Sequence, residues 1–151
     1  ALSLVAALGT GLKSMTIAMV VASIPSFTRM VRSIVLTVVR QDYIEAARSC
    51  GTKHATIIFS HVLPNAMGPI IVNATMNVAG LILSAASLSF IGMGIQPPNP
   101  EWGYMLSESI AYMRIAPHLV IFPGMAIVIT ALCFNLLGDG LADAFDPKRR
   151  G

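Results

Sequence analysis

Three long apolar stretches, separated by shorter polar segments, dominate the pattern of hydrophobic and polar positions along this chain. Each stretch approaches the roughly 20 apolar residues that a helix needs to cross the hydrocarbon core of a bilayer. The first stretch is short between its flanking charges, Lys13 and Arg29, but long basic side chains in such positions reach the interface. The pattern therefore predicts an all-α, polytopic membrane protein with spans at about residues 14–36, 65–90 and 116–138.

Shorter features interrupt this pattern. Residues 1–8 are too few to span a bilayer and predict the end of a helix, which the glycine pair in GTG at 9–11 interrupts. Pro25 predicts a kink in the first span. The second apolar stretch is longer than one crossing needs, so we expect its last part, LSFIGMGIQ, to leave the helix.

The composition agrees with a membrane location. Hydrophobic residues make up 55% of the chain and charged residues 11%, and the mean hydropathy is +0.74. A soluble domain carries about 25% charged residues, so this chain is too poor in charge to cover a globular surface. The net charge of +3 is too small to indicate a nucleic-acid partner. Two cysteines without regular spacing predict neither a disulfide framework nor a zinc finger.

The basic residues indicate an orientation. The segment from 29 to 64 contains Arg29, Arg32, Arg40, Arg48 and Lys53. The tail contains Lys148, Arg149 and Arg150, whereas Arg114 is the one basic side chain between 96 and 118. Lys and Arg are concentrated in short cytoplasmic loops. The loop at about 40–64 and the C-terminus are therefore predicted to be cytoplasmic, and the loop at about 96–115 to be extracytoplasmic.

The polar insert EAARSCGTKHATIIFSHVLP, residues 45–64, predicts two short helices joined by a turn. Gly51 suits the position just after a helix, where a positive φ is needed. Thr52 is placed to cap the second helix, and Pro64 to end it.

The same insert predicts a contact surface. Ala46 and Ala47 give a smooth face that a groove on another protein can approach, and Glu45 adds an orienting charge, as in helix-in-groove recognition. The alternative is an amphipathic helix that lies on the lipid surface.

Three motifs give this chain a family resemblance. The residues Glu45, Ala46, Ala47, Gly51, Leu63 and Pro64 match the EAA loop of permease subunits of binding-protein-dependent ABC importers. His61 stands where that pattern commonly has isoleucine, and HVLPN is similar to the peptide and nickel branch. The segments ASLSFIGMGIQPPNPEWG (86–103) and FNLLGDGLADAFDPK (134–148) resemble two further signatures of this branch, in particular of its C-type permease subunit. Together the motifs cover nearly all of the chain, in the family's order.

The resemblance implies a MetI-like permease core with cytoplasmic coupling helices. Residues 1–151 would be the C-terminal part of one permease domain of about six spans, in a bacterial or archaeal plasma (inner) membrane. The implied function is translocation of peptides or nickel, with no catalytic activity and no cofactor in this chain.

The resemblance also implies partners. These are a second permease subunit in a heterodimer, two cytoplasmic ATPase subunits and an extracytoplasmic substrate-binding protein, all in a lipid bilayer and without nucleic acid. In the family the EAA loop docks in a cleft on the ATPase, so the six residues of that motif are the candidate coupling residues.

Two other sets of residues are candidates for binding. Asn73 and Asn77 lie four apart in an uncharged span, where an amide needs a partner. They are expected either to bond to another helix or to line the translocation path. In the loop 96–103, the prolines and Trp102 predict a rigid loop with an interfacial anchor. Alternatively, as in the family, the substrate-binding protein contacts this loop at Pro97, Pro98, Glu101 and Trp102.

Other sites are disfavoured. GTGLKS lacks the spacing of a phosphate-binding loop. Cys50, His54 and His61 are spaced for one helix face only if helix continues through Gly51, so no metal is expected. Asp139, Asp143 and Asp146 are expected just past the last span, where they cap its cytoplasmic end.

Two functions from other classes stay open at this point. One is a membrane scaffold that recruits a soluble partner through the insert. The other is a secondary transporter driven by an ion gradient, which needs inverted repeats or carboxylates within the membrane. The acidic residues lie outside the clear spans, which counts against the second.

Overall fold

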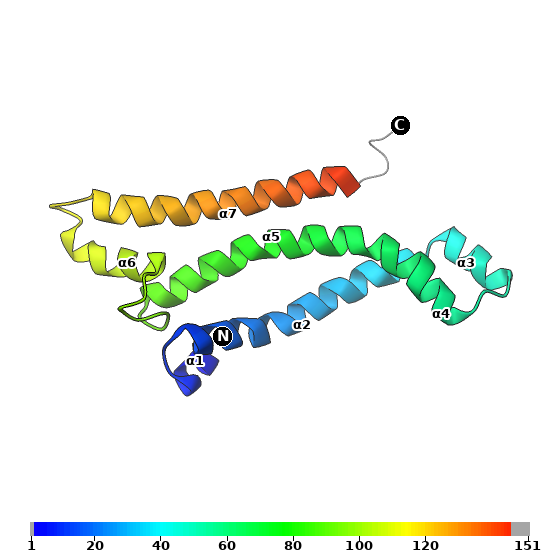
Figure 1. The fold of residues 1–151 in the computed structure, drawn as a ribbon, viewed down its shortest axis with the longest axis horizontal. Coiled ribbons are helices and arrows are strands. Elements are labelled where there is room, and N and C mark those ends of the chain that lie inside the picture. The colour runs from blue at the N-terminus through cyan, green and yellow to red at the C-terminus, as the bar shows by residue number, and fades with distance from the viewer. Residues whose placement is uncertain (1, 146–151) are drawn as a thin grey trace.

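The computed structural model describes residues 2–145, and within this range every regular element is a helix. Three helices of 28 residues form the body: α2 (Leu12–Val39), α5 (Leu63–Phe90) and α7 (His118–Phe145). α2 and α7 run in one direction, and α5 runs in the opposite direction between them (Figure 1). Helices α2, α7 and the segment that contains α5 are long and apolar enough to cross a membrane. The all-α class is confirmed.

Breaks at the N-terminal end follow the glycines. α1 (Leu2–Leu8) ends before a turn in which Gly9 and Gly11 have φ values of 84° and 143°. Only glycine adopts such angles without a steric cost. α2 then continues through Pro25.

α7 is longer than the span predicted for it. It reaches Phe145, so Asp139 and Asp143 lie inside the helix, and the prediction that they follow its end was wrong. The two glycines at 138 and 140 do not break the helix. Gly138 is buried against α5, where a Cβ would lie 2.6 Å from Cγ of Met76. Asp146, Lys148, Arg149 and Arg150 lie outside the described residues.

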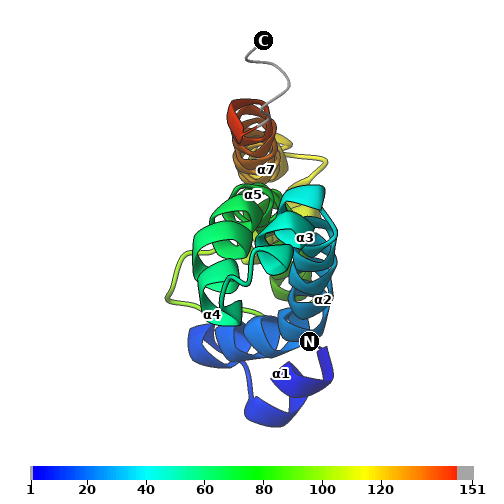
Figure 2. The same ribbon diagram turned by 90° about the vertical axis from the view of Figure 1, so that its right-hand side faces the viewer.

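The helices pack in a row rather than around a shared core. α5 contacts α2 on one side and α7 on the other, and the end-on view shows α7, α5 and α2 stacked in that order (Figure 2). At most 17% of the most apolar window of any of the three candidate spans is buried. Much apolar surface is therefore open to lipid or to other protein.

The short elements lie at the two opposite ends of the long helices (Figure 1). At one end are α3 (Asp42–Ser49), α4 (His54–Thr56) and the π-helical turn η1 (Ile57–Val62). We call residues 42–62 the EAA hairpin. At the other end are α1, α6 (Trp102–Ser109) and the 3-10 turn η2 (Ile110–Tyr112). The C-terminal end of α7 points toward the hairpin end, as the predicted topology requires.

Candidate functional site

The EAA hairpin begins with α3, whose charges are arranged for a stable short helix. Asp42 and Glu45 lie in its first turn, and Arg48 lies in its last. Carboxylates near the N-terminus and cations near the C-terminus interact favourably with the helix dipole. Ile44 is fully buried, whereas Glu45 and Arg48 are exposed. The helix therefore buries one apolar residue and presents its charges outward.

Gly51 forms the turn as predicted. Its φ is 75°, and its N–H donates to the carbonyl of Arg48 at 2.9 Å. The N–H of Thr52 donates to the carbonyl of Ala47 at 3.1 Å. These two bonds are the Schellman motif, which satisfies carbonyls at a helix end. The expected position of Gly51 just after the first helix is confirmed.

The predicted cap of the second helix was wrong by one residue. α4 begins at His54, and its N-cap is Lys53, which makes no side-chain capping bond. Thr52 belongs to the preceding turn, in which its N–H donates to the Ala47 carbonyl.

Pro64 does not end the second helix, which was the prediction. The helical segment is continuous from His54 to Phe90, and Pro64 occupies the first turn of α5. A proline costs little at such a position, where its missing N–H has no α-helical partner. The change from π to α winding at this point produces that position.

A small apolar cluster holds the hairpin together. Ile44, Ile57 and Val62 are buried, and Val35, Val38, Val39 and Ala47 pack against them. The cluster joins α3 to η1 and both to the C-terminal end of α2. Ala47 therefore belongs to the hairpin's own core, whereas Ala46 is exposed. The predicted smooth contact face contains Ala46 alone of this pair.

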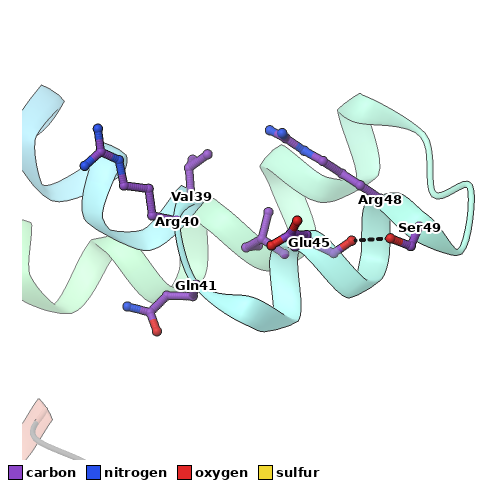
Figure 3. A pocket seen from close by; sticks show the side chains of 7 residues that line it. Val39, Arg40, Gln41, Glu45, Arg48 and Ser49 are labelled. Atoms are coloured by element: carbon purple, nitrogen blue, oxygen red, sulfur yellow. Dashed lines mark hydrogen bonds between the residues drawn. The ribbon is translucent and has the colours of Figure 1, made fainter.

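Charged side chains surround a pocket beside α3. The pocket has a volume of about 530 Å³ and is lined by Val39, Arg40, Gln41, Ile44, Glu45, Arg48 and Ser49 (Figure 3). Glu45 lies between Arg40 and Arg48 in this view, and the Ser49 hydroxyl donates to the Glu45 carbonyl at 3.1 Å. The two arginines were not among the predicted site residues. The three-residue spacing of Glu45 and Arg48 was the signal that indicated one of them.

The remaining residues of the EAA motif are also accessible. Gly51, Leu63 and Pro64 are exposed, and no atom lies within 4 Å of a Cβ built on Gly51. Of the motif, Ala47 alone packs against the buried cluster, and the other members are exposed.

Asn73 and Asn77 bond within their own helix. The Asn73 amide donates to the Pro69 carbonyl at 2.8 Å, and the Asn77 amide to the Asn73 carbonyl at 2.8 Å. Asn73 is half-buried and Asn77 is exposed. In the part of the chain that the structure describes, these amides do not join α5 to another helix.

The loop at the other end is fixed by close backbone contacts. Gly103 is buried, and a Cβ there would lie 2.7 Å from Cα of Ala86 and would overlap its carbonyl oxygen. A Cβ at Gly94 would overlap the side chain of Ser89, which is fully buried. The segment 86–103 therefore needs small residues at both positions.

The residues proposed to contact a binding protein lie on this loop. The Glu101 carboxylate accepts from the Tyr104 N–H at 2.7 Å and caps α6. Pro100, Glu101, Trp102 and Met105 line a pocket of about 390 Å³. Pro97, Pro98 and Trp102 are exposed.

Among residues 2–145, no group of three or more His, Cys, Asp or Glu side chains is placed to hold a metal ion. Cys50 and Cys133 are both free and exposed.

Residues 1–151 match the family model described as "Binding-protein-dependent transport system inner membrane component". The chain belongs to this family. It is 52% identical over 151 residues to the protein named "Glutathione transport system permease protein GsiD" in Salmonella typhimurium, Salmonella typhi and Shigella boydii serotype 4. Each alignment covers 100% of this chain and 50% of the relative. The chain spans about half the length of the curated relatives it matches.

Membership of this family tests several of the predictions made from the sequence. The MetI-like permease class is confirmed, and by family the chain is a non-catalytic component of a transport system in the inner membrane. The names of the relatives are consistent with the predicted peptide branch.

Proposed function

We propose that this chain is part of a permease subunit of an ATP-driven importer and forms part of a translocation path for small peptides. The relatives named as glutathione transport permeases support a peptide solute over nickel, because glutathione is a tripeptide. ATP is hydrolysed by partner subunits, and the EAA hairpin couples that hydrolysis to movement of the membrane helices.

One observation carries this proposal. The cluster of Ile44, Ile57 and Val62 ties α3 both to the end of α2 and to the segment that leads into α5. A partner that binds and displaces the hairpin therefore moves two candidate spans together. A loop without such a cluster would bend, and the displacement would not reach the membrane.

The exposed charges around the hairpin provide the contact. Glu45 pairs with a basic residue of the ATPase subunit, and Arg40 and Arg48 on either side add oppositely charged contacts. Ala46 and Gly51 permit close approach, Ala47 packs the hairpin core, and Leu63 and Pro64 lie where the hairpin joins α5. An ion pair that loses water in a cleft also gives specificity.

The proposal includes further partners, which the family resemblance supports. A second permease subunit forms a heterodimer with this one, and Asn73 and Asn77 line the path between them. The loop with Pro97, Pro98, Glu101 and Trp102 contacts an extracytoplasmic substrate-binding protein. Two ATPase subunits bind from the cytoplasm, on the side of the plasma (inner) membrane where the hairpin and the C-terminus lie.

The test uses the full-length subunit in a reconstituted complex with its partners. Glu45→Lys and Gly51→Pro should lower peptide uptake per ATP hydrolysed without lowering the amount of subunit in the membrane. The control is Glu108→Lys, which makes the same change from a negative to a positive charge on α6, at the opposite end of the long helices. It should leave peptide uptake per ATP hydrolysed unchanged. If both hairpin variants transport at the wild-type ratio, the hairpin is not the coupling element.

A further inference from the structure

The turn that connects the hairpin to α5 has unusual winding. Residues Ile57–Val62 form a π-helix inside a continuous helical segment from His54 to Phe90. π-helical turns are rare and occur frequently at functional sites. This turn has α-helix on both sides, so a change in its winding alters the rotation of everything before it.

The wider winding fits the proline that follows it. In an α-helix the ring of Pro64 would clash with the carbonyl of Ser60, four residues earlier. Instead, the N–H of Leu63 donates to the carbonyl of Ile58, five residues earlier. The side-chain amide of Asn65 donates to the carbonyl of His61 at 2.6 Å. The wider turn thus accommodates the proline ring, and the Asn65 bond is compatible with it, although Asn73 and Asn77 make the same type of bond in α winding.

The winding decides which side chains face the cluster. In an α-helix, residues five apart point about 140° away from each other, because each residue advances 100°. A π-helix has a wider turn with i→i+5 hydrogen bonds, so residues five apart point closer to the same side than they do in an α-helix. Ile57 and Val62 are five apart, and both are buried, at 4% and 6% exposed. Ile58 and Phe59 between them are 52% and 68% exposed.

We propose that the π-helical turn 57–62, which accommodates Pro64, positions the EAA hairpin for docking. It brings Ile57 and Val62 to the same side, where they enclose Ile44, and so fixes the direction in which α3 presents Glu45. This inference rests on the proposed coupling function. An α-helical turn would rotate the hairpin by about 100° and separate the two buried side chains.

The winding itself is tested by labelling. Single cysteines are placed at positions 57–62 of the full-length subunit in membranes, with Cys50 and Cys133 replaced by serine. A water-soluble maleimide should react slowly at positions 57 and 62 and faster at His61→Cys. If position 61 is protected and position 62 reacts, the turn is α-helical and the inference is overturned. This readout does not depend on coupling.

The positioning role is tested by deleting Ser60, an exposed residue within the turn. Removing one residue allows α winding and should lower uptake per ATP by about tenfold or more, the effect expected when a functional group is misplaced. Ser60→Ala, which keeps the residue count, should retain the wild-type ratio. Membrane levels are measured for both, and the labelling test decides the winding if the deletion variant does not fold.

Different results would contradict the proposed coupling function and the positioning inference. If Glu45→Lys uncouples the complex while the Ser60 deletion transports normally, the positioning inference is wrong and the coupling function stands. If Glu45→Lys has no effect, the coupling function itself is wrong.

Discussion

At the hairpin end, α3 is joined to its neighbours by the side chains of Ile44, Ile57 and Val62, whereas at the opposite end α6 lies against α5 through the backbone at Gly103. The contact at the hairpin end depends on large apolar side chains that fill the space between the helices. The contact at Gly103 depends on the absence of a side chain. The glycines differ in the same way. Gly51 has open space around it but a positive φ, while Gly103 has ordinary backbone angles and no space for a Cβ.

This difference suits the two ends to different tasks. Under the proposed function, a contact made by interlocking side chains would transmit a displacement of the hairpin to α2 and α5. A contact made through the backbone holds the loop 91–101 and α6 at a fixed distance from α5. Substitutions that remove volume should therefore damage the hairpin end, and substitutions that add volume should damage the other end.

Ile44→Ala is expected to have the largest effect. Ile44 is fully buried at the centre of the hairpin cluster, and truncating a buried isoleucine to alanine costs about 2–5 kcal/mol. The hairpin should loosen, so that thermal unfolding of the purified complex begins earlier and uptake per ATP falls. Ile44→Val, which removes one methylene, should cost about 0.5–1.5 kcal/mol. Equal effects of the two variants would show that the cluster is not tightly packed.

Gly103→Ala should come next. The added Cβ meets the backbone of Ala86, which cannot turn aside as a flexible side chain does, and overpacking costs about 1–3 kcal/mol. Gly80→Ala is the matched control, because it adds the same methyl group to α5 where no atom lies within 4 Å. The melting temperature of the complex should fall for Gly103→Ala and stay the same or rise for Gly80→Ala. A similar fall for both would contradict the close contact.

Gly51→Ala isolates the effect of backbone angle. The site has room for the methyl group, but alanine at a φ of 75° costs about 1 kcal/mol or more. Gly51→Asn should cost less, because asparagine adopts this conformation more readily. Limited proteolysis of the hairpin in detergent would rank the variants. The order alanine, then asparagine, then glycine in decreasing cleavage is expected, and the reverse order of the two substitutions would exclude this cause.

Glu101→Ala should have the smallest effect. It removes the carboxylate that accepts from the Tyr104 N–H, and the loss of a helix cap costs about 1 kcal/mol. Glu101→Asp keeps a capping oxygen and should retain most of this stability. Hydrogen exchange at the start of α6 would show faster exchange for the alanine variant only. The same faster exchange in the aspartate variant would show that a carboxylate at this position is not enough and that the length of the side chain matters.

Features set by local sequence were predictable. The apolar stretches between polar segments indicated the three long helices, and Gly51 indicated the end of α3, because a positive φ after a helix is a local requirement. Features set by tertiary contacts were not predictable from the local sequence. Pro64 is a helix stop by its local chemistry, yet it lies in the first turn of α5, where the preceding π-helical turn accommodates its ring.

The extent and packing of the helices show the same limit. α7 continues past Gly138, which packs closely against Met76 of α5, a contact that no spacing in the sequence reveals. Ala46 and Ala47 are identical in type and adjacent, yet one is exposed and the other packs in the cluster. The face of α3 that turns inward is fixed by Ile44, which was not among the predicted site residues.

Cross-linking from the hairpin tests the central claim most directly. In the reconstituted complex, with Cys50 and Cys133 replaced by serine, a photoreactive maleimide is attached to Ala46→Cys on the exposed face of α3, and to Asn99→Cys on the loop at the other end. The proposed coupling function predicts a cross-link to an ATPase subunit from position 46 and none from position 99, with position 46 labelled only from the cytoplasmic side. A label that reaches position 46 from the outer side, or an assembled complex without that cross-link, would contradict it.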